Sequence, residues 1–467
     1  MRAGQRRDIE TAVLFWCLIG GLAWLPYWYG SNDTFAWGVN AVLFPLLTIL
    51  FEAALLVRGQ GHPVGLKVVG SSFILFTVVI VWILVQNTTW TPSFLHHPIW
   101  SITADVLSKQ VAGSISVNRD LTALALMRLL TAGCTFWLAL QLCRDPARAS
   151  QLLMAVSIIA AGYAAYALVQ LSLQREALDA AEEIASPGFA TSTFFNRNHF
   201  ATYAGLGLIV ACGLLTRLYT YEVSIRVGSL GYKISSAIEA TGRWGTLLIC
   251  VAFVLLLGLM LTASRAGITA TVIGLCMFAV LSVAGRSGNA GERRVILFCG
   301  LAAAAIVSFL FGQAALGMLT EKGIADLNRS AVYILVLGSI LQAPFLGYGY
   351  GTFVDVFPMF RDNTVEGRGV WEYAHNTYLE VYQGLGVLFG SALILSVLLL
   401  ILKCCSGALM RERGSTTPKV AASVALLVGL HAFLDFSLQI QAINLTFAAV
   451  LGAGVAQANS SRAVTDD

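Results

Sequence analysis

Two arginines placed beside apolar runs are the residues best suited to hold an anion in this 467-residue chain. Arg265 lies between two apolar runs in the segment LTASRAGIT, and Arg329 starts a shorter apolar run, with Asn328 before it as a suitable helix N-cap. Planar guanidinium donors match phosphate oxygens, so the two side chains together suit a clamp around a diphosphate. Both also have structural interpretations, because Arg265 can end a helix at the membrane interface and Arg329 can pair with Asp326.

His375, in the segment EYAHNTYLE, is the candidate general base. It ends a long polar connection and precedes a long apolar run, which places it at a membrane boundary. Imidazole accepts a proton near neutral pH, although a single histidine is more often structural or exposed. Asn376 and Glu380 follow it and are candidates for binding a substrate. We predict that Arg265, Arg329 and His375 share one outward-facing cavity.

A second polar stretch, FFNRNHFATYAG, leads into another apolar run. Its Arg197, Asn198 and His199 suit sugar hydroxyls or phosphate, but ordinary helix capping accounts for the same pattern. Tyr348, in the glycine-rich segment LGYGYG, is a further substrate-binding candidate. That segment lacks the Lys-Ser/Thr and the strand–helix context of a nucleotide loop, so its glycines indicate a turn.

His431 and Asp435 are spaced four residues apart in the apolar segment LHAFLDFSLQI. If the segment is one helix, the two side chains lie on one face and suit a proton relay in a transporter. They suit equally a hydrogen bond that locks helices together. Arg128 and Glu52, which also lie inside apolar runs, are possible partners.

No group of Cys and His residues has the spacing of a metal site, so we expect no metal. The nine cysteines fall in apolar runs or at their basic ends, where packing is a better interpretation than disulfide bonding. We expect no cofactor.

The composition is that of a membrane protein, with 57% hydrophobic and 12% charged residues. An apolar run of about 18 residues or more can cross a hydrocarbon core about 30 Å thick as a helix. We therefore predict an all-α polytopic protein with about 12 transmembrane helices. The predicted spans are 11–27, 35–57, 66–86, 120–142, 150–172, 198–216, 244–262, 266–284, 295–314, 377–402, 420–438 and 441–457.

The basic residues set the predicted orientation. Most of the 29 Lys and Arg fall on one side if the N-terminus is cytoplasmic, as the positive-inside rule requires. Both termini are then cytoplasmic, the first apolar run is a retained helix, and the connections 87–119, 173–197 and 315–376 face outward. The chain 1–467 is predicted to form one membrane domain, with 315–376 inserted between the ninth and tenth spans. Within it, 329–341 is too short to span and suits an interfacial or re-entrant helix in a periplasmic cap of short helices.

The order of the motifs resembles the bacterial O-antigen ligase and polysaccharide polymerase family. The motifs that carry the resemblance are NRNHFA, SRAG, RSAVY, the P-x-L-G-x-G-x-G-x-F turn at 344–353, AHNTYLE and HAFLDFSLQI, spread over about residues 190–445. Two positions depart from the expected pattern: Gln441 replaces an expected proline, and Gln383 replaces an expected acid.

The resemblance implies a membrane-embedded glycosyltransferase of the type C-like fold in the bacterial inner membrane. Such an enzyme moves a glycan from an undecaprenyl-diphosphate carrier to an acceptor hydroxyl on the periplasmic face, without metal and with inversion. The acceptor is a lipid A core sugar or a growing polysaccharide. Arg265 and Arg329 would hold the diphosphate, and His375 would deprotonate the acceptor.

Two other classes of function remain open on the sequence. A multi-span transporter or flippase of lipid-linked saccharides fits the number of spans and the His431–Asp435 spacing. Polar residues would then concentrate near the bilayer midplane, whereas here they gather in the outer connections. An assembly scaffold would not need two arginines and a histidine at one boundary. The expected partners are the lipid-linked glycan donor, the acceptor and the bilayer, and no nucleic acid.

Overall fold

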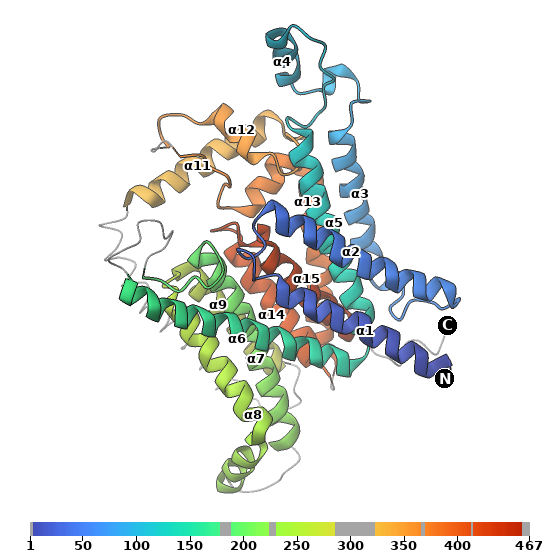
Figure 1. Ribbon diagram of the computed structural model, residues 1–467, viewed down its shortest axis with the longest axis vertical. Coiled ribbons are helices and arrows are strands. Elements are labelled where there is room, and N and C mark those ends of the chain that lie inside the picture. The colour runs from blue at the N-terminus through green and yellow to red at the C-terminus, as the bar shows by residue number, and fades with distance from the viewer. Residues whose placement is uncertain are drawn as a thin grey trace.

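The structure, a computed structural model, describes residues 3–177, 188–223, 230–284, 323–365, 369–411 and 414–459. Over these ranges the chain forms 14 α-helices joined by turns and short 3-10 helices, and no strand (Figure 1). The all-helical architecture agrees with the predicted polytopic membrane protein.

Nine helices of the described ranges are long and apolar enough to cross a membrane. Their order follows the apolar runs of the sequence, because each run continues until a capping residue, a turn or a polar segment ends it. These helices are α2 (Thr34–Val57), α3 (Gly70–Asn87), α5 (Arg119–Leu142), α6 (Pro146–Ala177), α7 (Arg197–Val223), α8 (Leu230–Leu261), α9 (Arg265–Ala284), α13 (Thr377–Met410) and α15 (Gln441–Ala458).

The other helices are shorter or less apolar. The apolar part of α1 covers Glu10–Trp24, and α14 has 16 residues. The predicted ninth span, 295–314, lies outside the described residues. The remaining helices are α1 (Ala3–Trp24), α4 (Ile99–Leu107), α11 (Gly323–Gln342), α12 (Phe353–Phe360) and α14 (Thr416–His431).

The predicted span 420–438 is wrong at its end. Helix α14 stops at His431, residues 432–440 form a turn with the 3-10 helix Ser437–Gln439, and α15 begins at Gln441. The turn is held from both sides: Thr377 N–H donates to the carbonyl of Ala432 over 2.9 Å, and Ala442 N–H donates to that of Gly30 over 3.1 Å. These bonds to distant segments replace the bonds that a continuing helix would make with itself.

Helices α7 and α15 form the centre of the bundle. In their most apolar 18-residue stretches, 83% and 89% of the residues are buried. Helix α15 packs on α5, α13 and α14, and α7 packs on α6, α8, α9 and α14. Small residues allow the close approach: a Cβ on Gly452 would lie 2.5 Å from the carbonyl oxygen of Phe136 in α5. Between apolar helices, such close packing replaces the hydrophobic driving force available in water.

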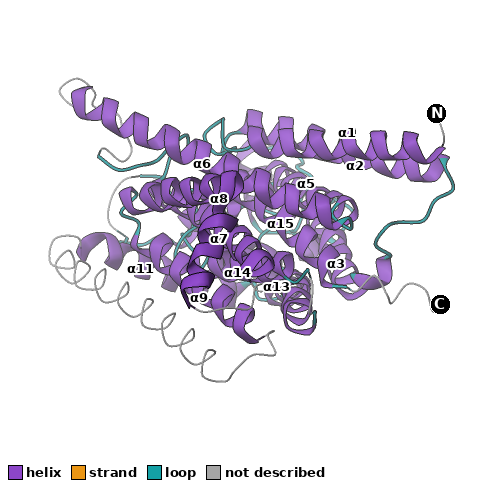
Figure 2. Ribbon diagram, turned by 90° about the horizontal axis from the view of Figure 1, so that it is seen from below, coloured by secondary structure: helices purple, strands orange, loops and turns teal. Residues whose placement is uncertain are grey.

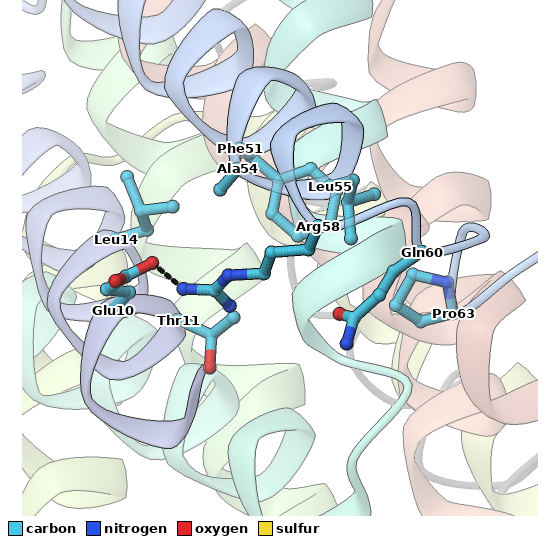
Figure 3. Close-up of a pocket in the computed structure, with 9 residues that line it drawn as sticks. All are labelled: Glu10, Thr11, Leu14, Phe51, Ala54, Leu55, Arg58, Gln60 and Pro63. Carbon is cyan, nitrogen blue, oxygen red and sulfur yellow. Dashed lines mark hydrogen bonds and ion pairs between the residues drawn. The ribbon is translucent and has the colours of Figure 1, made fainter. Parts of the chain in front are cut away.

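Helices α1 and α2 lie side by side along one flank of the bundle (Figure 2). Arg58, which ends α2, pairs with Glu10 of α1. The pair borders a small cavity that Thr11, Leu14 and Phe51 also line (Figure 3). The cavity lies at the ends of α1 and α2 away from the connection between them.

Basic side chains at this same end bind backbone carbonyls at helix termini. Arg144 donates to the carbonyls of Ala456 and Asn459 at the end of α15, and Arg411 donates to that of Gln457. Carbonyls at a helix C-terminus have no partner within the helix, and cations there also complement the helix dipole. These arginines therefore bind the carbonyls that α15 leaves free at its C-terminus.

The connection before α13 forms a compact unit of α11 and α12, which we call the α11–α12 segment (323–365). Helix α11 begins at Gly323, so Arg329 lies in its second turn and Asn328 is not its N-cap, contrary to prediction. The apolar run 329–341 is extended by the preceding residues into a 20-residue helix, which is still not among the candidate spans. In Figure 1, α11 and α12 lie side by side in the upper left of the view.

A glycine-rich crossing fixes the α11–α12 segment to α13. Gly347 has φ of +65°, and Gly386 interrupts α13 with φ of +77°. A Cβ on Gly347 would lie 2.3 Å from the carbonyl oxygen of Gly384. Two backbones thus touch where no other side chain fits, as the interpretation of LGYGYG as a turn requires.

We predict that Gly347→Ala destabilises the protein. The substitution combines a left-handed backbone with a collision against main chain, which together cost more than about 2 kcal/mol. Thermal unfolding in detergent measures the loss. Gly338→Ala is the matched control, because nothing lies within 4 Å of a Cβ there and alanine favours the helix. Equal melting temperatures for the two variants would refute the crossing as a fixed contact.

Candidate functional site

Asp435 is 1% exposed, and its carboxylate lies at the centre of a polar cluster in the turn 432–440. Oδ2 accepts a hydrogen bond of 2.8 Å from Nδ2 of Asn198, near the start of α7. Oδ1 accepts one of 2.7 Å from the backbone N–H of Phe436. The carboxylate therefore joins the turn to α7.

Two histidines approach the same carboxylate. Nε2 of His199 lies 3.6 Å from Oδ1 of Asp435, and Nδ1 of His375 lies 3.5 Å from it. These separations are longer than a normal N–H···O bond, so the two rings face the carboxylate without a short hydrogen bond to it. The side chain of His199 is 4% exposed and that of His375 is 21% exposed. Of the two, His375 is the one that a bound molecule can reach.

The pKa of Asp435 lies well below its usual range. Burial alone would raise that pKa, but the interactions with His199 and His375, and the nearby His431, outweigh the burial penalty. Asp435 is therefore an anion at neutral pH. An anion beside an imidazole holds the ring in one orientation and stabilises its protonated form.

The backbone of His375 has an uncommon conformation for a residue with a side chain, with φ of +54°. Its carbonyl accepts a hydrogen bond of 2.9 Å from the hydroxyl of Tyr333 in α11. The next residue, Asn376, caps α13 by accepting hydrogen bonds from two N–H groups of the first turn. His375 is thus fixed by α11 on one side and by α13 on the other.

Aromatic rings surround the imidazole of His375. Phe436 and Trp371 contact it edge to face, with ring centroids 4.9 Å and 5.7 Å away, and Tyr373 stacks on Phe436 at 4.1 Å. Nδ1 is buried on the side of Asp435. The exposed part of the side chain is therefore the remainder, which carries Nε2. An accessible Nε2 opposite an Nδ1 that faces a carboxylate suits a general base.

His431, the last residue of α14, packs beside this pair. Its Nδ1 lies 2.7 Å from Oγ1 of Thr202 in α7 and 2.9 Å from Oγ of Ser437 in the turn. Helix α14 ends at His431, but the N–H of Asp435 still donates to the carbonyl of His431 over 2.9 Å. The imidazole joins α14, α7 and the turn, as in the interpretation of the pair as a lock between helices.

Three arginines approach the cluster from different helices. Arg197 begins α7 and Arg265 begins α9, and the two half-buried guanidinium groups are close enough to repel each other. Arg329 of α11 is close enough to His431 to act on its charge. Positive charge therefore collects around the start of α9 and the histidines, from residues far apart in sequence.

The other predicted substrate-binding residues have mainly structural contacts. Asn198 and His199 hold Asp435, and Asn376 caps α13. Tyr348 is buried in the α11–α12 segment, where its hydroxyl donates to the carbonyl of Ser339 over 3.1 Å. Glu380 accepts hydrogen bonds from the protein through both carboxylate oxygens.

The sequence did not identify Asp435 as the partner of His375. The pair is separated by 60 positions in sequence, and the predicted helix placed Asp435 against His431. The signal in the sequence was the row of polar residues Asp435, Ser437, Gln439 and Gln441, which is too polar for the middle of a membrane helix.

Comparison with known proteins matches part of the chain to a protein family. Residues 250–395 match the model of the family described as O-antigen ligase. The matched range contains Arg265, Arg329 and His375, and the resemblance found in the sequence is thereby confirmed. No curated protein matches the chain.

We predict that Asp435→Asn lowers the stability by about 3 kcal/mol at neutral pH, since it removes the charge that both histidines face. A carboxylate with a lowered folded-state pKa stabilises the fold fully above its unfolded pKa, about 3.9. That contribution is lost only as the pH falls through the lower folded value, so the deficit should stay constant between about pH 5 and 8.

Thermal unfolding in detergent across this pH range checks the prediction. The control is Asp33→Asn, because Asp33 caps α2 at an exposed position and asparagine caps equally well. A deficit that disappears between about pH 7 and pH 5 would contradict an ionised Asp435.

Proposed function

Because residues 250–395 carry an O-antigen ligase domain, we propose that this protein is a membrane glycosyltransferase. It transfers a glycan from an undecaprenyl-diphosphate-linked donor to a hydroxyl of an acceptor. The observation that carries the proposal is the pair Asp435–His375. Arg197 precedes Asn198, which binds Asp435, while Arg265 lies near Arg197 and Arg329 lies near His431. A base and several cations at one end of an apolar bundle suit a reaction between a hydroxyl and a lipid diphosphate.

Arg265 and Arg329 bind the diphosphate of the donor, and Arg197 adds to the positive charge. Arg265 is the first residue of α9, where backbone N–H groups at the helix start also favour an anion. Mutual repulsion between Arg197 and Arg265 is relieved when a diphosphate lies between or beside them. Cations held in place stabilise the charge that develops on the leaving diphosphate, so the step needs no metal ion.

His375 deprotonates the acceptor hydroxyl through Nε2. The acceptor oxygen then attacks the anomeric carbon, the bond from that carbon to the diphosphate oxygen breaks, and the proton remains on the imidazole until it passes to water. Asp435 stabilises the imidazolium in the meantime. Attack opposite the leaving group inverts the configuration at the anomeric carbon.

We propose that the site faces the periplasm of a bacterial inner membrane, with both chain termini in the cytoplasm. The end of the bundle that holds Arg58, Arg144, Lys403 and Arg411 is then cytoplasmic, as the positive-inside rule favours. His375 and Asp435 lie at the other end. The acceptor is a lipid A core sugar or the growing polysaccharide itself.

The test is glycan transfer by the purified protein in detergent, with EDTA present. The donor is an undecaprenyl-diphosphate-linked oligosaccharide, offered with lipid A core or with further oligosaccharide as acceptor. We expect wild-type protein to be active in EDTA, and His375→Ala and Arg265→Ala to lose at least about 100-fold in rate.

The matched control is Arg119→Ala. Arg119 lies at the same end of the bundle as His375, and its guanidinium lies over the ring of Trp100. This variant should retain activity. A folded wild-type protein that is inactive with every donor and acceptor would overturn the proposal and favour transport of lipid-linked saccharides instead.

A further inference from the structure

The carboxylate of Glu380 connects the segment that carries His375 to the turn that carries Asp435. Oε1 accepts a hydrogen bond of 2.6 Å from the backbone N–H of Ala374, the residue before His375. Oε2 accepts one of 2.7 Å from Nε2 of Gln439, in the turn 432–440. One side chain thus fixes both halves of the His375–Asp435 pair to each other.

Arg128 of α5 holds the other side of this connection. Its guanidinium donates to the backbone carbonyl of Gln439 and lies over the ring of Trp37, 4.2 Å from the ring centroid. It also interacts with the carboxylate of Glu380 and with the hydroxyl of Tyr373. The positive charge of Arg128 therefore compensates the carboxylate where both lie inside the bundle.

The contacts of Glu380 with the protein explain its position without a contact to the substrate. Each of its carboxylate oxygens already accepts a strong donor from the protein. Arg128 and Gln439 lie outside the range 250–395, so this connection joins the matched part of the chain to the helices before and after it.

We propose that Arg128, Glu380 and Gln439 are positioning residues that set the distance between His375 and Asp435. The inference rests on the proposed glycan transfer. A displacement of about 1 Å at a catalytic group can cost about 100-fold in rate, so loosening this connection should lower kcat. Substrate affinity should change little, because the three side chains are engaged with groups of the protein.

The experiment exchanges the donor and the acceptor of the hydrogen bond between Gln439 and Glu380. Gln439→Glu places two carboxylates against each other, and we expect kcat to fall at least about 10-fold while KM for the donor stays within about 2-fold.

Adding Glu380→Gln to this variant restores the bond in the opposite direction. The new amide at position 380 accepts from the Ala374 N–H and donates to the new carboxylate at position 439, which keeps one negative charge beside Arg128. We expect kcat of the double variant to recover to within about 3-fold of wild type.

The assay is that of the proposed function, with undecaprenyl-diphosphate-linked oligosaccharide as the probe and rates expressed per folded molecule. Glu372→Gln is the control, since it removes an exposed carboxylate from the same segment. If Gln439→Glu fails to fold, Gln439→Met removes the donor without adding charge and should lower kcat about 3-fold or more.

The outcomes separate this inference from the proposed function. An inactive wild-type protein contradicts the function itself. An active wild type with unchanged kcat in Gln439→Glu or Gln439→Met overturns the positioning role, and so does a loss that appears only in KM or is not restored by the exchange.

Discussion

An ionised carboxylate inside an apolar bundle is costly unless other groups compensate it, and this constraint organises the end of the bundle at which α7 and α13 begin. Asp435 meets the constraint through Asn198 and His199 of α7 and through His375 at the start of α13. These helices must therefore converge on the turn 432–440, and α14 must end before that turn. The same convergence gives His375 a buried Nδ1 beside the carboxylate and leaves the rest of its ring accessible. The contacts that compensate the buried charge of Asp435 are therefore the same contacts on which the proposed catalysis depends.

The neighbouring elements serve this arrangement from a distance. The centre of the bundle is made of α7 and α15, whose small residues allow close packing and so keep the ends of the helices in fixed positions. The α11–α12 segment is tied to α13 where Gly347 meets the main chain of Gly384, and it contributes Tyr333 to the backbone of His375. Arg265 and Arg329 belong to two different helices, α9 and α11. In the proposed mechanism, a lipid diphosphate that binds both of them lies next to the imidazole of His375.

The apolar runs predicted most helices well, because run length and capping residues are local properties. The run 35–57, for example, becomes α2 at Thr34–Val57, with Asp33 as its N-cap. The predicted span 420–438 failed because Ala432, Phe433 and Leu434 continue the apolar pattern through a turn. The carbonyl of Ala432 and the side chain of Asp435 bind this turn to other helices. The candidates Arg265, Arg329 and His375 were recognisable as charges beside apolar runs. Glu380 was recognisable as a substrate-binding candidate but not by its contacts, since its partner Gln439 lies 59 positions away and their partner Arg128 lies 311 positions from Gln439.

The most direct measurement is an experimental structure of the protein in a lipid nanodisc with undecaprenyl diphosphate, the lipid product of the proposed reaction. We expect the diphosphate within hydrogen-bond distance of Arg265 and Arg329, with the imidazole of His375 facing it and still paired with Asp435. A diphosphate bound instead at the opposite end of the bundle, near Glu10 and Arg58, would contradict the proposed site. So would a separation of more than about 20 Å between His375 and the two arginines, because one lipid diphosphate and one acceptor hydroxyl could not then react together.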